Sequence, residues 1–215
     1  MARIMIRRSR IMNPLFSIWT QPSATIRYIV DHKSLKYPFI IISISALINS
    51  IMAFADLGLF NGFSLLTTLG LVLLSGLLSG LAGWGIIIVA YTWIGKLLGG
   101  TGTMRKMGLA TGASAIPMIW TAPIGFIAIS LYGQQLFTTP TGPLGTNMSV
   151  GFFFFQTWLM LAISIFGLII ECKAIGIVHN FSAWRGFGTL MLFTGFIIII
   201  SIIIFGALFS ILLAF

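Results

Sequence analysis

The stretch LLGGTGTMRKMGLATGASAIP, residues 97–117, places glycines, two adjacent cations and a proline between two long apolar segments. A P-loop requires G-x-x-x-x-G-K-[ST] between a strand and a helix, and a dinucleotide fingerprint requires G-x-G-x-x-G in the same setting. Neither the spacing nor a preceding strand pattern is present. We therefore interpret the stretch as a joint between two membrane-spanning helices, with Arg105 and Lys106 at the lipid headgroups.

The composition of the chain excludes an ordinary soluble domain. Of its 215 residues, 58% are hydrophobic and only 7% are charged, and the mean hydropathy is +1.09. A soluble domain carries about a quarter charged residues, which it needs to cover a surface facing water. The sequence therefore predicts an integral membrane protein.

Five apolar segments are long enough to cross or nearly cross a bilayer, for which about 20 residues are needed. They are residues 38–55, 65–95, 109–133, 151–170 and 187–215. We predict an all-α, polytopic bundle of five transmembrane helices over residues 38–215, preceded by a basic N-terminal segment over residues 1–37.

The charges indicate the orientation of these spans. Twelve Lys and Arg oppose three Asp and Glu, and all twelve fall in residues 1–37, 96–108 and 171–186. These are alternate flanking segments of a five-span protein, so the positive-inside rule places the N-terminus in the cytoplasm and the C-terminus outside the plasma membrane. We expect the basic excess to contact anionic lipid headgroups and not nucleic acid.

The segment before the first span predicts an amphipathic helix. Arg27 lies on its polar face, Ile26 and Ile29 lie on the other face, and Trp19 lies just upstream. Such a helix is expected to lie in the cytoplasmic membrane interface with its apolar side in the acyl boundary. Packing of the same side on the helical bundle is the alternative.

Small residues predict close helix packing at two places. Gly76 and Gly80 form a G-x-x-x-G in the second span, which lets two backbones approach each other. Packing inside one bundle is favoured over homodimerisation, because a five-helix bundle needs such seams itself. Gly108, Gly112 and Pro117 are expected to start a closely packed and bent third span.

Enzymatic and metal chemistry find little support. Ser114 lies in a G-x-S-x tetrad similar to that around the intramembrane serine of rhomboid proteases, but a serine nucleophile needs a nearby base. Only His179 is available, and it lies at a membrane edge. Glu171, Cys172 and His179 could be imagined as metal ligands, but zinc sites use three or four ligands and no further Cys or His is available to complete one. We predict no enzyme, no cofactor and no metal, and expect Glu171 to pair with Lys173.

Three segments together resemble a known family. They are NPLFSIWTQPSATIRYIVD (13–31), LGGTGTMRKMGLATGASAIPMI (98–119) and ECKAIGIVHNFSAWRGFGTLML (171–192). In order and spacing they are similar to the bacterial branch of the YIP family, the Ypt/Rab-interacting protein domain. The D-L-Y-G-P element and the long acidic N-terminus associated with eukaryotic members are absent. The resemblance implies a five-span fold, a cytoplasmic N-terminus and assembly with partners, either a second copy or other membrane proteins.

Two functional hypotheses remain open. In the first, the cytoplasmic face binds anionic lipids or partner proteins and thereby organises membrane or trafficking-type processes. In the alternative, the bent helices surround a cavity and transport a small solute, an ion or a lipid. A cavity reaching Asn49, Gln156 or Pro117 would favour the alternative. The residues expected to carry the first function are Trp19, Arg27, Arg105, Lys106, Lys173, His179 and Arg185.

Overall fold

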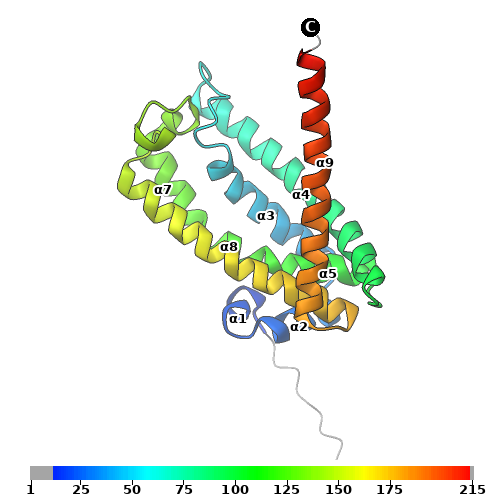
Figure 1. The fold of residues 1–215 in the computed structure, drawn as a ribbon. Helices are drawn as coiled ribbons and strands as arrows, with labels where there is room; N and C mark the ends of the chain where they lie inside the picture. The colour runs from blue at the N-terminus through cyan, green and yellow to red at the C-terminus, as the bar shows by residue number, and fades with distance from the viewer. Residues whose placement is uncertain (1–11, 214–215) are drawn as a thin grey trace, which may run out of the picture.

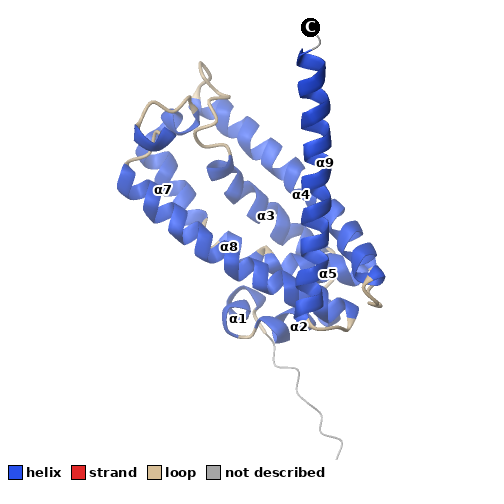
Figure 2. Cartoon of the chain, in the orientation of Figure 1, coloured by secondary structure: helices blue, strands red, loops and turns tan. Residues whose placement is uncertain are grey.

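The computed structural model describes residues 12–213, and within this range the chain is helical with short connections and no strand (Figures 1 and 2). Four of the twelve cations, Arg3, Arg7, Arg8 and Arg10, lie outside the described residues. The all-α fold class is confirmed.

Four helices are long and apolar enough to cross a membrane: α3 (Lys36–Ala53), α4 (Leu65–Leu97), α8 (Val150–His179) and α9 (Ala183–Leu213). A fifth crossing is formed by α5 (Met104–Ser114), α6 (Ile116–Ile119), α7 (Ala122–Tyr132) and η1 (Gly133–Phe137), if its two bent halves count as one span. The bend between these halves is 43°. The chain is therefore a multi-pass helical bundle of the predicted kind.

Prolines explain why the third span breaks. Pro117 occupies the first turn of α6, and a second proline, Pro123, occupies the first turn of α7. Proline lacks an N–H and is tolerated only in a first turn, so each ends one helix and begins another. The predicted bend is confirmed.

Asn49 of α3 connects its own helix to the broken span. Its side-chain amide donates hydrogen bonds to the Ser45 carbonyl (2.9 Å) and to the Met118 carbonyl of α6 (3.5 Å).

Side-chain caps set the starts of the long helices. The hydroxyl of Ser64 accepts a hydrogen bond from the Thr67 N–H at the start of α4, and Ser149 does the same for Phe152 in α8. Each hydroxyl satisfies one of the backbone donors that an α-helix leaves unpaired in its first turn.

Two polar loops at this end of the bundle are in contact with each other. The Asp56 carboxylate accepts hydrogen bonds from Thr146 and from the backbone of Asn147.

The N-terminal helices differ from the expected arrangement. They are α1 (Pro14–Thr20) and α2 (Pro22–His32), and α2 packs on α5 and α8. Ile26 and Ile29 are fully buried there, so the apolar side of α2 contacts protein and not the acyl boundary. The helix is amphipathic as predicted, and packing on the bundle is the alternative that the structure adopts.

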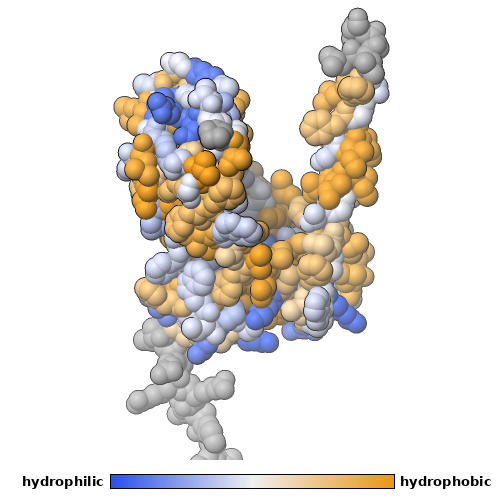
Figure 3. Space-filling model, turned by 60° about the vertical axis from the view of Figure 1, so that its left-hand side comes forward, coloured by the Kyte–Doolittle hydropathy of each residue, from blue (hydrophilic) through white to orange (hydrophobic). Residues whose placement is uncertain are grey.

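The last helix leaves the bundle. The first half of α9 packs on α8 and α4, but no side chain from Phe196 to Ser210 is buried. In Figures 1 and 3 the second half of α9 extends away from the other helices. Most of its apolar side chains are therefore exposed and free to meet lipid or another membrane protein.

Candidate functional site

The described cations gather at one end of the bundle, which we call the basic end. This end holds α2, the α4–α5 connection, and the α8–α9 turn, and hydrophilic residues mark it along the lower edge of Figure 3. These cations are Arg27, Lys33, Lys36, Lys96, Arg105, Lys106, Lys173 and Arg185. Lys33 and Lys173 are half-buried, and the other six cations are exposed.

The buried His179 connects two segments of the basic end, the α4–α5 loop and the end of α8. The loop from α4 to α5 wraps around His179, the last residue of α8, and a Cβ on Gly95, Gly100 or Gly102 would overlap its ring. The Gly102 N–H donates a hydrogen bond of 3.0 Å to Nδ1 of His179, while Nε2 lies 3.0 Å from the Tyr91 carbonyl. We call these three glycines and His179 the histidine latch.

The latch corrects the expected role of His179. Because Nδ1 accepts a hydrogen bond, the proton of the neutral ring belongs on Nε2, which donates it to the Tyr91 carbonyl. The ring is only 1% exposed, and it stacks on Phe181 at 5.3 Å. It cannot contact a headgroup or a partner and instead fixes the loops that carry exposed cations. Arg105 and Lys106 follow the latch loop directly, at the start of α5.

Close approaches continue from the latch along α5. A Cβ on Gly112 would overlap Pro38 of α3, and a Cβ on Gly108 would lie 3.1 Å from the Ile88 Cδ1 atom of α4. Pro117, at the next break, is buried. These residues form the seam of α5 against α3 and α4.

The G-x-x-x-G of the second span faces α3. A Cβ on Gly76 would overlap the Ser50 side chain, and one on Gly80 would overlap Ala46. The structure thus uses both glycines inside the bundle, in the contact between α3 and α4. The predicted packing of this motif inside one bundle is therefore what the structure shows.

Trp19 and Arg27 occupy different surroundings. The Trp19 ring stacks on Phe166 of α8, with centroids 4.9 Å apart, and remains 38% exposed. Arg27 is exposed on α2. Trp19 therefore attaches α1 to the bundle, while Arg27 is free to contact an anion.

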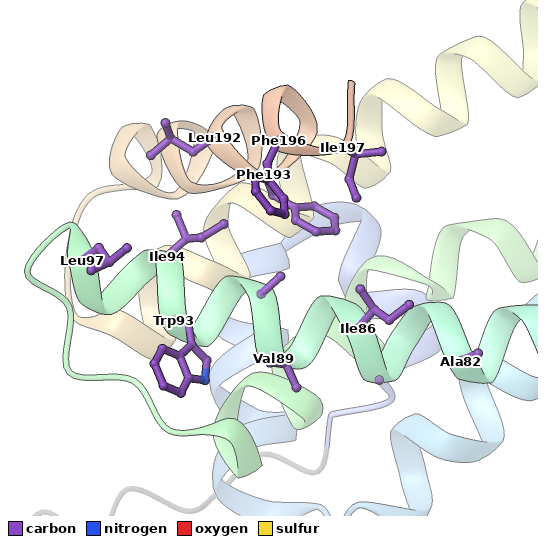
Figure 4. Close-up of a pocket in the computed structure, with 12 residues that line it drawn as sticks. Ala82, Ile86, Val89, Trp93, Ile94, Leu97, Leu192, Phe193, Phe196 and Ile197 are labelled. Carbon is purple, nitrogen blue, oxygen red and sulfur yellow. The ribbon is translucent and has the colours of Figure 1, made fainter. Parts of the chain in front are cut away.

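Two apolar grooves flank the first half of α9. One, of about 850 Å³, lies between α4 and α9, where Phe193, Phe196 and Ile197 face α4 (Figure 4). The other, of about 380 Å³, lies between α8 and α9 and is lined by Lys173 and Trp184 among apolar side chains. Arg185 is exposed next to Trp184, and Lys96 precedes Leu97 of the first groove. Cations and apolar grooves thus occur together at the basic end.

Comparison with known proteins connects this architecture to a family. The model of the Yip1 domain matches residues 16–213, from α1 to the end of α9. The chain belongs to the Yip1 domain family. The resemblance to the YIP family drawn from the three sequence segments is thus confirmed, while the bacterial branch stays a prediction. Two of those segments meet in the histidine latch. Neither the curated proteins nor the solved structures contain a match.

The Yip1 domain protein lacks the geometry of a serine hydrolase at Ser114. The Ser114 hydroxyl donates a hydrogen bond of 2.7 Å to the Thr111 carbonyl, and both ring nitrogens of His179 are engaged by backbone groups. Within residues 12–213, no three His, Cys, Asp or Glu side chains come together as metal ligands. Cys172 is buried and free.

The structure also separates the expected pair of Glu171 and Lys173. Residues two apart on a helix point to different sides. Lys173 lines the groove beside α9, whereas Glu171 lines a separate cavity between α3, α4, α5 and α8. This cavity was not predicted from the sequence, and neither was a role for Trp184, which is 81% exposed at the start of α9. The signal for Trp184 was available, since tryptophan is enriched at membrane interfaces.

Proposed function

We propose that this Yip1 domain protein is a non-enzymatic membrane protein that binds anionic lipids at its basic end. Through that surface it organises its membrane or brings partner proteins to it. The observation that carries the proposal is the occurrence of cations beside apolar grooves at one end of the bundle. A phospholipid needs both features, a cation for its phosphate and an apolar surface for its acyl chains.

The groove between α8 and α9 supports the proposal in most detail. Lys173 is half-buried among Leu168, Phe187 and Trp184. Lysine stems pack on apolar surface while the ammonium reaches the headgroup region. Trp184 supplies the amphipathic ring that favours the same depth. One anionic phospholipid lying along this groove satisfies both residues.

The basic end faces the cytoplasm in this proposal. All eight described cations lie there, and loops rich in Lys and Arg are retained on the cytoplasmic side of a membrane. The cytoplasmic leaflet carries the anionic lipids that attract such segments, at about 1 kcal/mol per cation near the surface. Orientation and ligand thus agree.

Lipid-dependent thermal stability tests the proposal. Purified protein is heated in detergent with phosphatidylglycerol or with phosphatidylcholine of the same acyl chains. We expect the anionic lipid to raise Tm more, and Lys173→Gln to reduce the difference. Lys33→Gln removes a basic-end cation that follows α2, contacts Tyr28 and Tyr37 and does not line the groove between α8 and α9, so it should reduce the difference less than Lys173→Gln does. Equal stabilisation by both lipids would count against the proposal.

Transport is a second candidate, favoured by one observation. The third span is bent by 43°, and its first part, α5, borders the cavity that Glu171 lines. Asn49, Gln156 and Pro117 do not line that cavity, contrary to the arrangement anticipated for a transporter. Flux of a solute across liposomes containing the protein would separate this candidate from lipid binding alone.

A further inference from the structure

A cavity of about 180 Å³ lies between α3, α4, α5 and α8, and polar side chains form part of an otherwise apolar lining. Its polar lining consists of Ser79, Trp84, Thr111, Ser114 and Glu171. One water occupies about 30 Å³ in the liquid, so the cavity has room for a small ion with part of its hydration shell.

The hydrogen-bond donors around this cavity are already used. The Trp84 Nε1–H donates to the Thr111 hydroxyl at 3.1 Å, and that hydroxyl donates to the Met107 carbonyl at 2.9 Å. The Ser79 hydroxyl donates to the Gly76 carbonyl at 3.2 Å, and the Ser114 hydroxyl donates to its own helix. What remains are lone pairs on oxygen. A cavity of acceptors repels anions and attracts cations.

Glu171 supplies the one carboxyl group among the residues that line this cavity. Within residues 12–213 no Lys, Arg or His nitrogen lies within 4.0 Å of that carboxylate. Glu171 precedes the end of α8 by about 12 Å, at about 1.5 Å per residue, so it lies inside the spanning bundle. A carboxylate in such surroundings is costly without a counter-charge.

We propose that this cavity binds a small monovalent cation. Glu171 is its charged ligand, and the hydroxyl oxygens of Ser79, Thr111 and Ser114 are neutral ligands. A single carboxylate balances one positive charge, whereas calcium sites commonly draw on several carboxylate oxygens. The inference goes beyond lipid binding, because Glu171 and Lys173 line different sides of α8 and either site can exist without the other.

The test is binding of ²²Na⁺ to the purified full-length protein, with Na⁺, Li⁺, K⁺ and NH₄⁺ as competitors and choline keeping the ionic strength constant. We expect saturable binding in the wild type and in Asp31→Asn, which removes an exposed acid from α2. We expect its loss in Glu171→Gln. Ser114→Ala should weaken binding about tenfold, since one oxygen ligand of a charged group is lost.

Thermal stability keeps the inference falsifiable if binding is weak. We expect Na⁺ in place of choline to raise Tm in the wild type and in Asp31→Asn but not in Glu171→Gln. The Gln variant should fold, because a neutral amide has no charge to desolvate. If no cation binds saturably or raises Tm in the wild type, or if Glu171→Gln behaves like the wild type, the inference is wrong. A carboxyl group that is simply protonated would give that result.

Discussion

The backbone N–H of Gly102 lies 3.0 Å from Nδ1 of His179 and donates a hydrogen bond to it. This contact joins the loop between α4 and α5 to the end of α8. Asn180 adds a side-chain hydrogen bond to Thr101 of the same loop, at 3.0 Å. The segments that present Arg105, Lys106, Lys173 and Arg185 are thus fixed relative to one another, which makes the basic end one surface.

The latch predicts an unequal response of two glycines in one helix. Gly95→Ala places a methyl group against the His179 ring, whereas Gly83→Ala in the same helix meets no atom within 4 Å. Overpacking costs about 1–3 kcal/mol. We expect Gly95→Ala to lower Tm by several degrees and Gly83→Ala to leave it unchanged or raise it slightly. A thiol-reactive fluorophore that reports exposure of the single buried Cys172 measures both.

A double-mutant cycle identifies the cause of the Gly95 effect. His179→Ala is itself destabilising, because it opens a cavity and leaves the Gly102 N–H without its partner. In that background the methyl group of Gly95→Ala no longer meets a ring and should cost little. An equally large cost in both backgrounds would show that the ring is not what limits residue 95.

The seam between α3 and α4 makes a second prediction. Gly80→Ala overlaps the Ala46 methyl group, so we expect a loss of stability of about 1–3 kcal/mol. Ala46→Gly combined with Gly80→Ala should recover most of it. Because both residues lie inside one bundle, the oligomeric state measured by light scattering should stay the same. A change of oligomeric state without loss of Tm would instead indicate an interface between copies.

The packing of α2 makes a third prediction. Ile29 is fully buried, and Ile→Ala substitutions in protein cores cost about 2–5 kcal/mol. Phe16 is 60% exposed, so Phe16→Ala should have a smaller effect on Tm in detergent. If α2 instead had its apolar side in lipid, Ile29→Ala would weaken membrane contacts and leave Tm in detergent unchanged.

Orientation is checked by cysteine labelling in intact cells. Leu57→Cys places an exposed thiol at the end opposite to the basic end, and Met104→Cys places one at the basic end. In a Cys172→Ala background, we expect a membrane-impermeant maleimide to label residue 57 in intact cells and residue 104 only after lysis. The reverse pattern would overturn the positive-inside assignment.

Much of the fold was predictable because its physical signals are local. Apolar length gave the long helices, and Pro117 marked one break of the third span. The packing of α2 was not predictable, since an amphipathic helix has the same pattern whether protein or lipid covers it. The burial of His179 required glycines distant in sequence, and nothing near residue 179 indicates them. The placement of Glu171 likewise depends on how four helices meet.

Native mass spectrometry of the protein with a mixture of anionic and zwitterionic lipids of equal acyl chains tests the central claim most directly. We expect the anionic lipid to remain bound preferentially, and a triple Lys96→Gln, Lys173→Gln, Arg185→Gln variant to lose that preference while keeping its Tm. Added salt should weaken the preference, because exposed charges are screened. Binding without headgroup preference in the wild type, or an unchanged preference in the triple variant, would contradict the claim that the basic end recognises anionic lipids.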